Sequence, residues 1–167
     1  MKEIITTDAF NLFKPENCIF VLSVEADGHP SGMTACWQMK CSHEPPLMAI
    51  SLFKSGYTHK LIKESKEFVI AVPNKSQEND LLYFGSNHGD KVDKFKETGI
   101  ETLPAKYLKT PLLKNASMNF ECVLEKEVDS GDHIIFIGRV VAAHVDEGKK
   151  ILLNMKKENG QRVFEEY

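Results

Sequence analysis

Cysteine and long apolar runs are both scarce in this sequence. Only four of the 167 residues are cysteines, and no two of them form a CxxC pair, whereas small secreted domains held by disulfides carry many more. We therefore predict reduced thiols, with Cys18 and Cys122 as small buried apolar side chains. The longest apolar stretch, residues 134–145, is interrupted by Arg139. No bilayer span and no signal peptide are predicted, which favours a cytoplasmic protein.

An excess of positive charge is also missing. The chain has 21 Lys and Arg residues against 24 Asp and Glu residues, a formal net charge of -3. A general nucleic-acid binder normally carries a basic face that neutralises phosphates, so that class of protein is not expected. With 42% hydrophobic and 27% charged residues, the composition is that of a globular protein. We predict a single domain over residues 1–167, because no repeat or Pro/Gly-rich linker divides the chain.

Several familiar site motifs are absent. The chain has no G-x-G-x-x-G, no G-x-x-x-x-G-K-[ST] and no G-x-S-x-G, so no Rossmann site, P-loop or nucleophile elbow is expected. His43 and Glu44 are followed by two prolines, which prevents a helical H-E-x-x-H zinc site. The six histidines show no paired ligand spacing, and we predict no metal site.

Predicted strands dominate the first third of the chain. Residues 18–25 are rich in β-branched and aromatic side chains and lead into a turn at 26–30. A second strand is predicted over 32–41 and a third, mostly buried, over 47–52.

The middle of the chain is mixed, and the last third returns to strands. The predicted helices are 58–65, with Ser55 or Thr58 as N-cap, 77–84, 91–98 and a weak helix at 149–156; the predicted strands are 67–72, 118–128 and 133–145, the last two joined by a turn at 129–132. Strands without long intervening helices predict a mainly β antiparallel barrel with peripheral helices.

A set of ordered motifs resembles one known family. Gly-Met-Thr-Ala-Cys-Trp at 32–37, then His-Glu-Pro-Pro-Leu at 43–47 and Ser51, resemble the opening of the flavin reductase-like family. That family includes flavoredoxin and the reductase components of two-component monooxygenases. Further matches follow in the family's order at 58–65, 68–73, 84–95 and 131–140.

The resemblance implies an FMN-binding antiparallel split barrel, a homodimer with the flavin near the subunit interface. Members pass electrons between NAD(P)H and flavin or relay them through bound FMN. Two positions depart from the pattern, because the family often has Ser or Thr in place of Cys36 and Asn in place of Ala71. Cys36 is the poorer hydrogen-bond donor, and Ala71 removes one polar contact.

The flavin ring needs a dry flat surface with backbone hydrogen-bonding groups at its polar edge. The small residues Thr34, Ala35 and Cys36 would allow the backbone to approach the ring closely. Trp37 either forms a wall of this site or fills the core.

A phosphate site is predicted at the start of the helix after the third strand. Ser51, Lys54, Ser55 and Thr58 gather there, and free amides with the helix dipole favour an anion. His59 is a further candidate at the same helix start. The alternative for this cluster is a Ser/Thr cap with a solvated lysine.

Three other residues have two interpretations each. Lys91 and Lys94 either reach the phosphate or the flavin N1 edge, where a cation stabilises reduced flavin, or belong to a solvated face. His133 either orients nicotinamide or another partner over the ring or is a surface or cap residue. Hydride transfer depends on stacking and distance, so no acid–base dyad is expected.

Three functions remain open at this point. The first is an oxidoreductase that transfers electrons between NADH or NADPH and flavin. The second is a flavoredoxin-like electron-transfer protein with bound FMN, fed by a protein partner. The third is a flavin-binding module without turnover.

Overall fold

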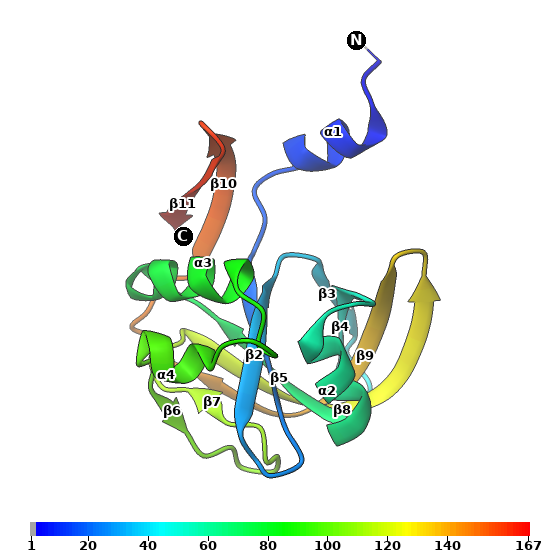
Figure 1. The fold of residues 1–167 in the computed structure, drawn as a ribbon, viewed down its shortest axis with the longest axis vertical. Coiled ribbons are helices and arrows are strands. Elements are labelled where there is room, and N and C mark those ends of the chain that lie inside the picture. Colours follow the sequence, from blue (N-terminus) through cyan, green and yellow to red (C-terminus); the bar gives the residue numbers. More distant parts are fainter. Residues whose placement is uncertain (1–2) are drawn as a thin grey trace.

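The computed structural model describes residues 3–167 and confirms a mainly β fold with helices around it (Figure 1). The strands of the main sheet are β1 (Ile19–Val24), β2 (Pro30–Ala35), β3 (Gln38–Ser42), β4 (Leu47–Phe53), β5 (Glu67–Val72), β8 (Met118–Ser130) and β9 (His133–Val145). All neighbours are antiparallel, in the order β2-β1-β5-β8-β9-β4-β3. The predicted antiparallel arrangement is therefore confirmed.

The connection between β2 and β3 forces the sheet to curl. These strands lie at opposite edges of the sheet, yet only Cys36 and Trp37 separate them in the chain. The three Cα–Cα steps from Ala35 to Gln38 span no more than about 11 Å. The two edges must therefore meet, and β2 lies beside β4. The sheet closes as a barrel whose seam is at Cys36 and Trp37.

The described part of the chain has four α-helices. They are α1 (Thr6–Leu12), α2 (Tyr57–Ser65), α3 (Glu78–Ser86), which follows the 3-10 turn η1 (Lys75–Gln77), and α4 (Lys94–Thr98). Of these, α2, α3 and α4 pack on the barrel. None of them is long and apolar enough to pass through a lipid bilayer. A short β-pair, β6 (Thr102–Leu103) with β7 (Leu112–Leu113), lies in the loop before β8.

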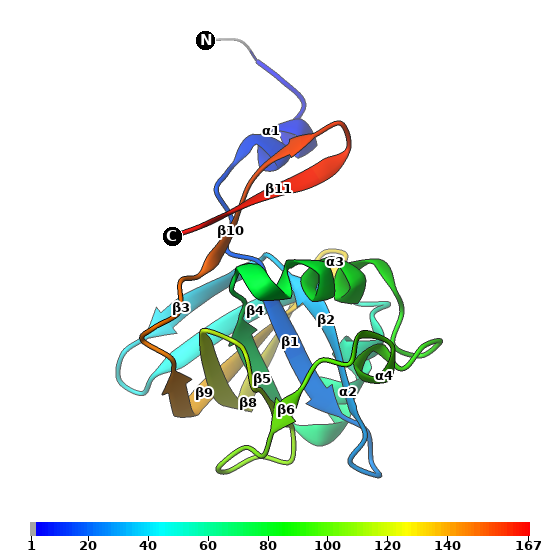
Figure 2. The same ribbon diagram turned by 90° about the vertical axis from the view of Figure 1, so that its left-hand side faces the viewer.

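Both ends of the chain extend from the same end of the barrel (Figures 1 and 2). Helix α1 has no buried residue. A hairpin of β10 (Leu152–Glu158) and β11 (Gln161–Glu166) extends from the same end of the barrel. Backbone hydrogen bonds between Glu16 and Asn154, 2.9 and 3.0 Å long, tie the two terminal segments together. Residues from both ends of the chain therefore meet above the seam of the barrel.

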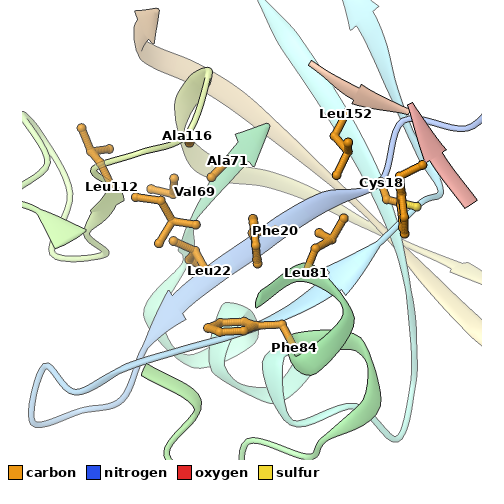
Figure 3. Packing of buried hydrophobic residues seen from close by; sticks show 12 residues of the cluster. Cys18, Phe20, Leu22, Val69, Ala71, Leu81, Phe84, Leu112, Ala116 and Leu152 are labelled. Atoms are coloured by element: carbon orange, nitrogen blue, oxygen red, sulfur yellow. The ribbon is translucent and has the colours of Figure 1, made fainter. Parts of the chain in front are cut away.

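Strand β1 is buried along its whole length because it has apolar neighbours on both faces. Ile19 and Val21 join a cluster drawn from six strands and α2, including Phe68 and Phe136, which fills the barrel. Phe20 and Leu22 point the other way and pack with Leu81 and Phe84 of α3 (Figure 3). This alternation places one core inside the barrel and a second beneath α3.

Three of the predicted elements need correction. The strand predicted over 32–41 is divided at the seam into β2 and β3. The helix predicted over 149–156 is wrong, because β10 occupies this region and turns into β11 through Asn159 and Gly160, both with positive φ, a typical hairpin turn. The N-cap of α2 is Gly56, with no side-chain cap, and not Ser55 or Thr58.

The prediction of four reduced thiols is also wrong. Cys18 and Cys36 form a disulfide. The reason is the register of the β1–β2 pair, in which Ile19 lies opposite Ala35. Cys18 directly precedes Ile19 and Cys36 directly follows Ala35, so the two cysteines face each other. Cys122 is a free, fully buried thiol, as predicted, and burial raises its pKa to about 12.

Candidate functional site

A cavity of about 270 Å³ opens at the seam of the barrel. It lies where β2 ends, beside the end of β4 and the start of β9, and the two terminal segments complete it. Six of the residues predicted for the flavin site line this one cavity: Thr34, Ala35, Cys36, Trp37, Ser51 and His133. The structure thus brings together residues that are up to 99 positions apart in the chain.

An aromatic group forms one wall of this cavity. The ring of His133 stacks on Trp37, with centroids 4.7 Å apart and planes at 29°, and lies 4.0 Å from the ring of Phe53. Trp37 is 48% exposed and Phe53 is 53% exposed, whereas His133 is buried. Trp37 therefore does not fill the core, and its exposed indole is available for a flat ligand.

A carboxylate fixes the orientation of His133. Its Nδ1 lies 2.6 Å from Oδ1 of Asp132. This hydrogen bond holds the pKa of Asp132 below its ordinary value. The imidazole is therefore held between two aromatic rings and one carboxylate, a geometry suited to positioning a planar group.

The terminal segments give the cavity a positive charge. Lys14, Lys157 and Arg162 line it together with one acid, Glu16, which forms an ion pair with Lys14. Three cations against one carboxylate favour an anionic ligand. Sequence reasoning missed these residues, because no motif connects them to the seam and only the folded hairpin brings them there.

One residue that lines the cavity has an unpaired acceptor. Asn154 is 1% exposed and donates its Nδ2 to Glu16 at 3.1 Å. Its Oδ1 is buried and has no hydrogen-bond partner within residues 3–167. Buried acceptors are normally paired, so this oxygen is suited to a ligand N–H such as the one at flavin N3. The aromatic wall, the cations and this acceptor together fit a flavin.

A second cavity of about 430 Å³ lies at the start of α2. Lys54, Ser55 and His59 line it, and all three belong to the predicted phosphate site. His59 Nε2 is buried without a partner in the described residues, and burial lowers the pKa of His59. Lys54 Nζ lies 2.7 Å from Asp129. The end of β4 therefore lines the first cavity, and the loop that follows it lines the second.

The remaining predicted residues lie elsewhere. Thr58 is buried in the first turn of α2, and the exposed Lys91 lines neither of these two cavities. Lys94 is 4% exposed and donates to the carbonyl oxygens of Gly32, at 2.9 Å, and Phe84, at 2.7 Å. Burial lowers its pKa to about 8. Lys94 therefore neither contacts the phosphate site nor belongs to a solvated face. Its ammonium group instead links α4 to β2 and α3 through these hydrogen bonds.

The sequence and the fold both match known proteins. The model of the flavin reductase like domain matches residues 15–161. A functionally uncharacterised protein of Archaeoglobus fulgidus is 38% identical over 119 residues, which are 71% of this chain and 66% of that relative. This chain thus spans about two thirds of the relative's length.

Two solved structures share the whole architecture. Flavoredoxin of Desulfovibrio vulgaris (Miyazaki F) superposes with a TM-score of 0.85 and 25% identity, covering 100% of this chain and 93% of its own. The NADH:FAD oxidoreductase of Streptomyces globisporus gives a TM-score of 0.85 at 23% identity, covering 100% and 98%. The predicted antiparallel split barrel is confirmed, and the chain belongs to the flavin reductase like domain family.

Proposed function

We propose that this protein is an FMN-binding oxidoreductase that transfers electrons between NAD(P)H and flavin. The observation that carries this proposal is the cavity at the seam, where six residues predicted from the family resemblance meet an aromatic wall, an excess of cations and an unpaired acceptor. Family membership supports a flavin-related redox function. FMN, when bound, supplies the hydride-accepting ring.

Three groups of the chain would hold the flavin ring. The backbone at Thr34 to Cys36 would lie against it, and Trp37 would cover it. Asn154 Oδ1 would accept a hydrogen bond from its polar edge. Lys157 and Arg162 would stabilise the negative charge of a reduced flavin. His133 would position the nicotinamide, with proximity rather than proton transfer providing the rate acceleration.

A flavoredoxin-like electron carrier is the second candidate. The likeness to the flavoredoxin of Desulfovibrio vulgaris, at 25% identity over the whole chain, favours it. In this case a protein partner, and not a pyridine nucleotide, reduces the bound FMN. The net charge of -3 suits a basic partner surface.

One spectroscopic experiment separates these functions. The full chain is loaded with FMN, freed from excess flavin and kept anaerobic while NADH or NADPH is added. The oxidoreductase is expected to lose its flavin absorbance with either nucleotide. A bound flavin that responds only to a reduced protein donor would indicate the electron carrier, and one that responds to neither donor would indicate a binding module. Failure to take up any flavin would contradict the proposal.

We expect the Lys54→Ala substitution to weaken FMN binding about fivefold, since it removes one partly exposed cation from the proposed phosphate site. Binding of riboflavin, which lacks the phosphate, is expected to stay unchanged. Titration of flavin fluorescence measures both affinities. Lys114→Ala is the matched control, because Lys114 is similarly exposed, pairs with Glu101 at 3.0 Å and lines neither cavity. An equal loss for FMN and riboflavin would show that Lys54 does not contact phosphate.

We also propose that the protein acts as a homodimer in the cytoplasm, where reduced pyridine nucleotide is available. Helix α1 and its flanks expose Ile5 at 70%, Leu12 at 74% and Phe13 at 84%, which a second copy of the chain would cover. Light scattering after size-exclusion chromatography is expected to give twice the mass of the chain. A mass equal to one chain would contradict the dimer.

A further inference from the structure

The disulfide lies at the edge of the proposed flavin site. Cys18 is fully buried at the start of β1, whereas Cys36 is half-buried at the seam and lines the cavity of about 270 Å³. Cys36 also lines the adjoining apolar cavity that contains Phe10 and Phe13. One sulfur of the pair is therefore accessible to a ligand in the cavity, and its partner is shielded from solvent.

A guanidinium group approaches both sulfur atoms. Nη1 of Arg162 lies 3.1 Å from Sγ of Cys18 and 3.0 Å from Sγ of Cys36. A disulfide sulfur gains little from a cation, but a thiolate next to Arg is strongly stabilised. The position of Arg162 therefore favours a cysteine pair that is reduced during function over one that only links two strands.

The same group of side chains does not suit a metal ion. Glu16, Cys18 and Cys36 offer three ligand atoms within 4.8 Å of one another. However, Glu16 already pairs with Lys14, and Arg162 occupies the approach to both sulfurs. A divalent cation would have to displace two cationic side chains, so thiol chemistry fits this cluster better than metal binding.

We propose that Cys18–Cys36 is a redox-active disulfide, a second two-electron carrier that exchanges electrons with the flavin in the adjoining cavity. This inference rests on the flavin binding proposed above. The location we propose for the protein agrees with it, because disulfides of cytoplasmic proteins are usually catalytic or redox-sensing.

The exchange balances without a further reactant. The S–S bond breaks on accepting two electrons from reduced FMN, which returns to its oxidised form. One thiol and one thiolate result. Anionic reduced FMN supplies the proton of the thiol, and Arg162 pairs with the thiolate. In the reverse direction the thiol and the thiolate lose two electrons and one proton as the S–S bond forms. Reduced pyridine nucleotide supplies the electrons that enter the flavin.

Counting thiols tests the exchange directly. The FMN-loaded chain is reduced anaerobically by light and EDTA, then quenched in acid, unfolded and alkylated with iodoacetamide. Mass spectrometry is expected to show two labels before reduction, at Cys41 and Cys122, and four after it. The flavin-free chain treated in the same way is expected to keep two. Two labels on a protein whose flavin is fully bleached would overturn the inference.

A reductive titration provides the second test. Wild-type protein is expected to need two equivalents of dithionite per bound FMN, and Cys18→Ser only one. Cys41→Ser is the matched control, because Cys41 is an exposed free thiol outside the pair, and it is expected to need two. Protein that binds no flavin would contradict the proposed function, whereas wild type that binds flavin and needs one equivalent would overturn only the disulfide exchange.

The role of Arg162 has its own readout. In protein reduced with dithiothreitol and then freed from it, we expect Arg162→Gln to slow alkylation of Cys36 at pH 7 by on the order of tenfold, because less thiolate is present. Alkylation of Cys41 serves as the internal control. An unchanged rate at Cys36 would overturn the assignment of Arg162 as the partner of the thiolate.

Discussion

Trp37→Ala is expected to weaken FMN binding by on the order of 100-fold. The indole is 48% exposed and lines both cavities at the seam. Stacking a flavin on it would remove on the order of 100 Å² of apolar surface from water, worth about 2.5 kcal/mol, and aromatic stacking adds about 0.5 kcal/mol. Their sum corresponds to about two powers of ten in affinity.

The effect on FMN can be separated from general damage to the fold. Titration monitored by flavin fluorescence gives the affinity, and circular dichroism checks the strands. Met39→Ala is the matched control, because Met39 is 60% exposed on β3 and lines neither cavity. Trp37→Phe is expected to keep most of the affinity. Wild-type affinity in Trp37→Ala would show that the flavin does not lie on this ring.

The barrel was predictable because its strands carry unambiguous local signals. Residues 19–24 are apolar at nearly every position, which matches a strand buried on both faces. The turn at 129–132 lies between two long alternating segments, and β8 and β9 pair there as expected. The helix predicted over 149–156 is wrong although Ile151, Leu152 and Met155 have helical spacing. The turn at Asn159 and Gly160 instead favours a β-hairpin.

The disulfide was within reach of the sequence but required the register of a hairpin. The turn near Gly28 sets Val24 opposite Pro30, and six further residues along each strand lead to Cys18 and Cys36. Composition and cysteine spacing do not reveal this strand register, and from them alone reduced thiols are expected. The segment that we propose to bind the ring could be found from local motifs for the opposite reason, because Thr34 to Trp37 are contiguous.

The charged side of the site had no sequence signal. Lys157 and Arg162 reach the seam only because the β10–β11 hairpin folds back, and the contact between Glu16 and Asn154 spans 138 positions. Lys94 is the opposite case, in which the local sequence suggests the wrong environment. A lysine in a charged segment has the pattern of a solvated residue, yet Lys94 is buried. Its burial depends on two carbonyl groups from β2 and α3 that no local pattern specifies.

Glu121 is expected to be a large source of stability outside the proposed flavin site. It is fully buried in β8. Its carboxylate accepts hydrogen bonds from the backbone N–H groups of Lys106 and Tyr107, each at 2.8 Å, and lies 2.7 Å from Nε2 of His144. One side chain thereby fastens the loop between β6 and β7 to the β8–β9 pair.

Glu121→Ala is expected to lower the free energy of unfolding by about 4 kcal/mol, because it leaves two amides and an imidazole without their acceptor. Urea denaturation at pH 7 measures the change. Glu125→Ala is the matched control on the same strand. Its carboxylate pairs with Arg139 at 2.7 Å but is 40% exposed, so we expect a loss of less than about 1 kcal/mol. Similar losses for both variants would contradict the special role of Glu121.

The acid dependence of stability gives Glu121 a signature that packing alone would not. Burial raises the pKa of Glu121, but its hydrogen bonds to Lys106, His144 and Tyr107 outweigh burial and hold that pKa below its ordinary value of 4.5. A carboxylate with a lowered pKa stabilises the fold fully above pH 4.5 and loses this contribution as pH falls through the folded-state pKa. Glu121→Gln lacks this titration, so its deficit in unfolding free energy relative to wild type is expected to shrink below about pH 4.5. A deficit that stays constant between pH 7 and pH 3 would mean that the charge of Glu121 contributes nothing.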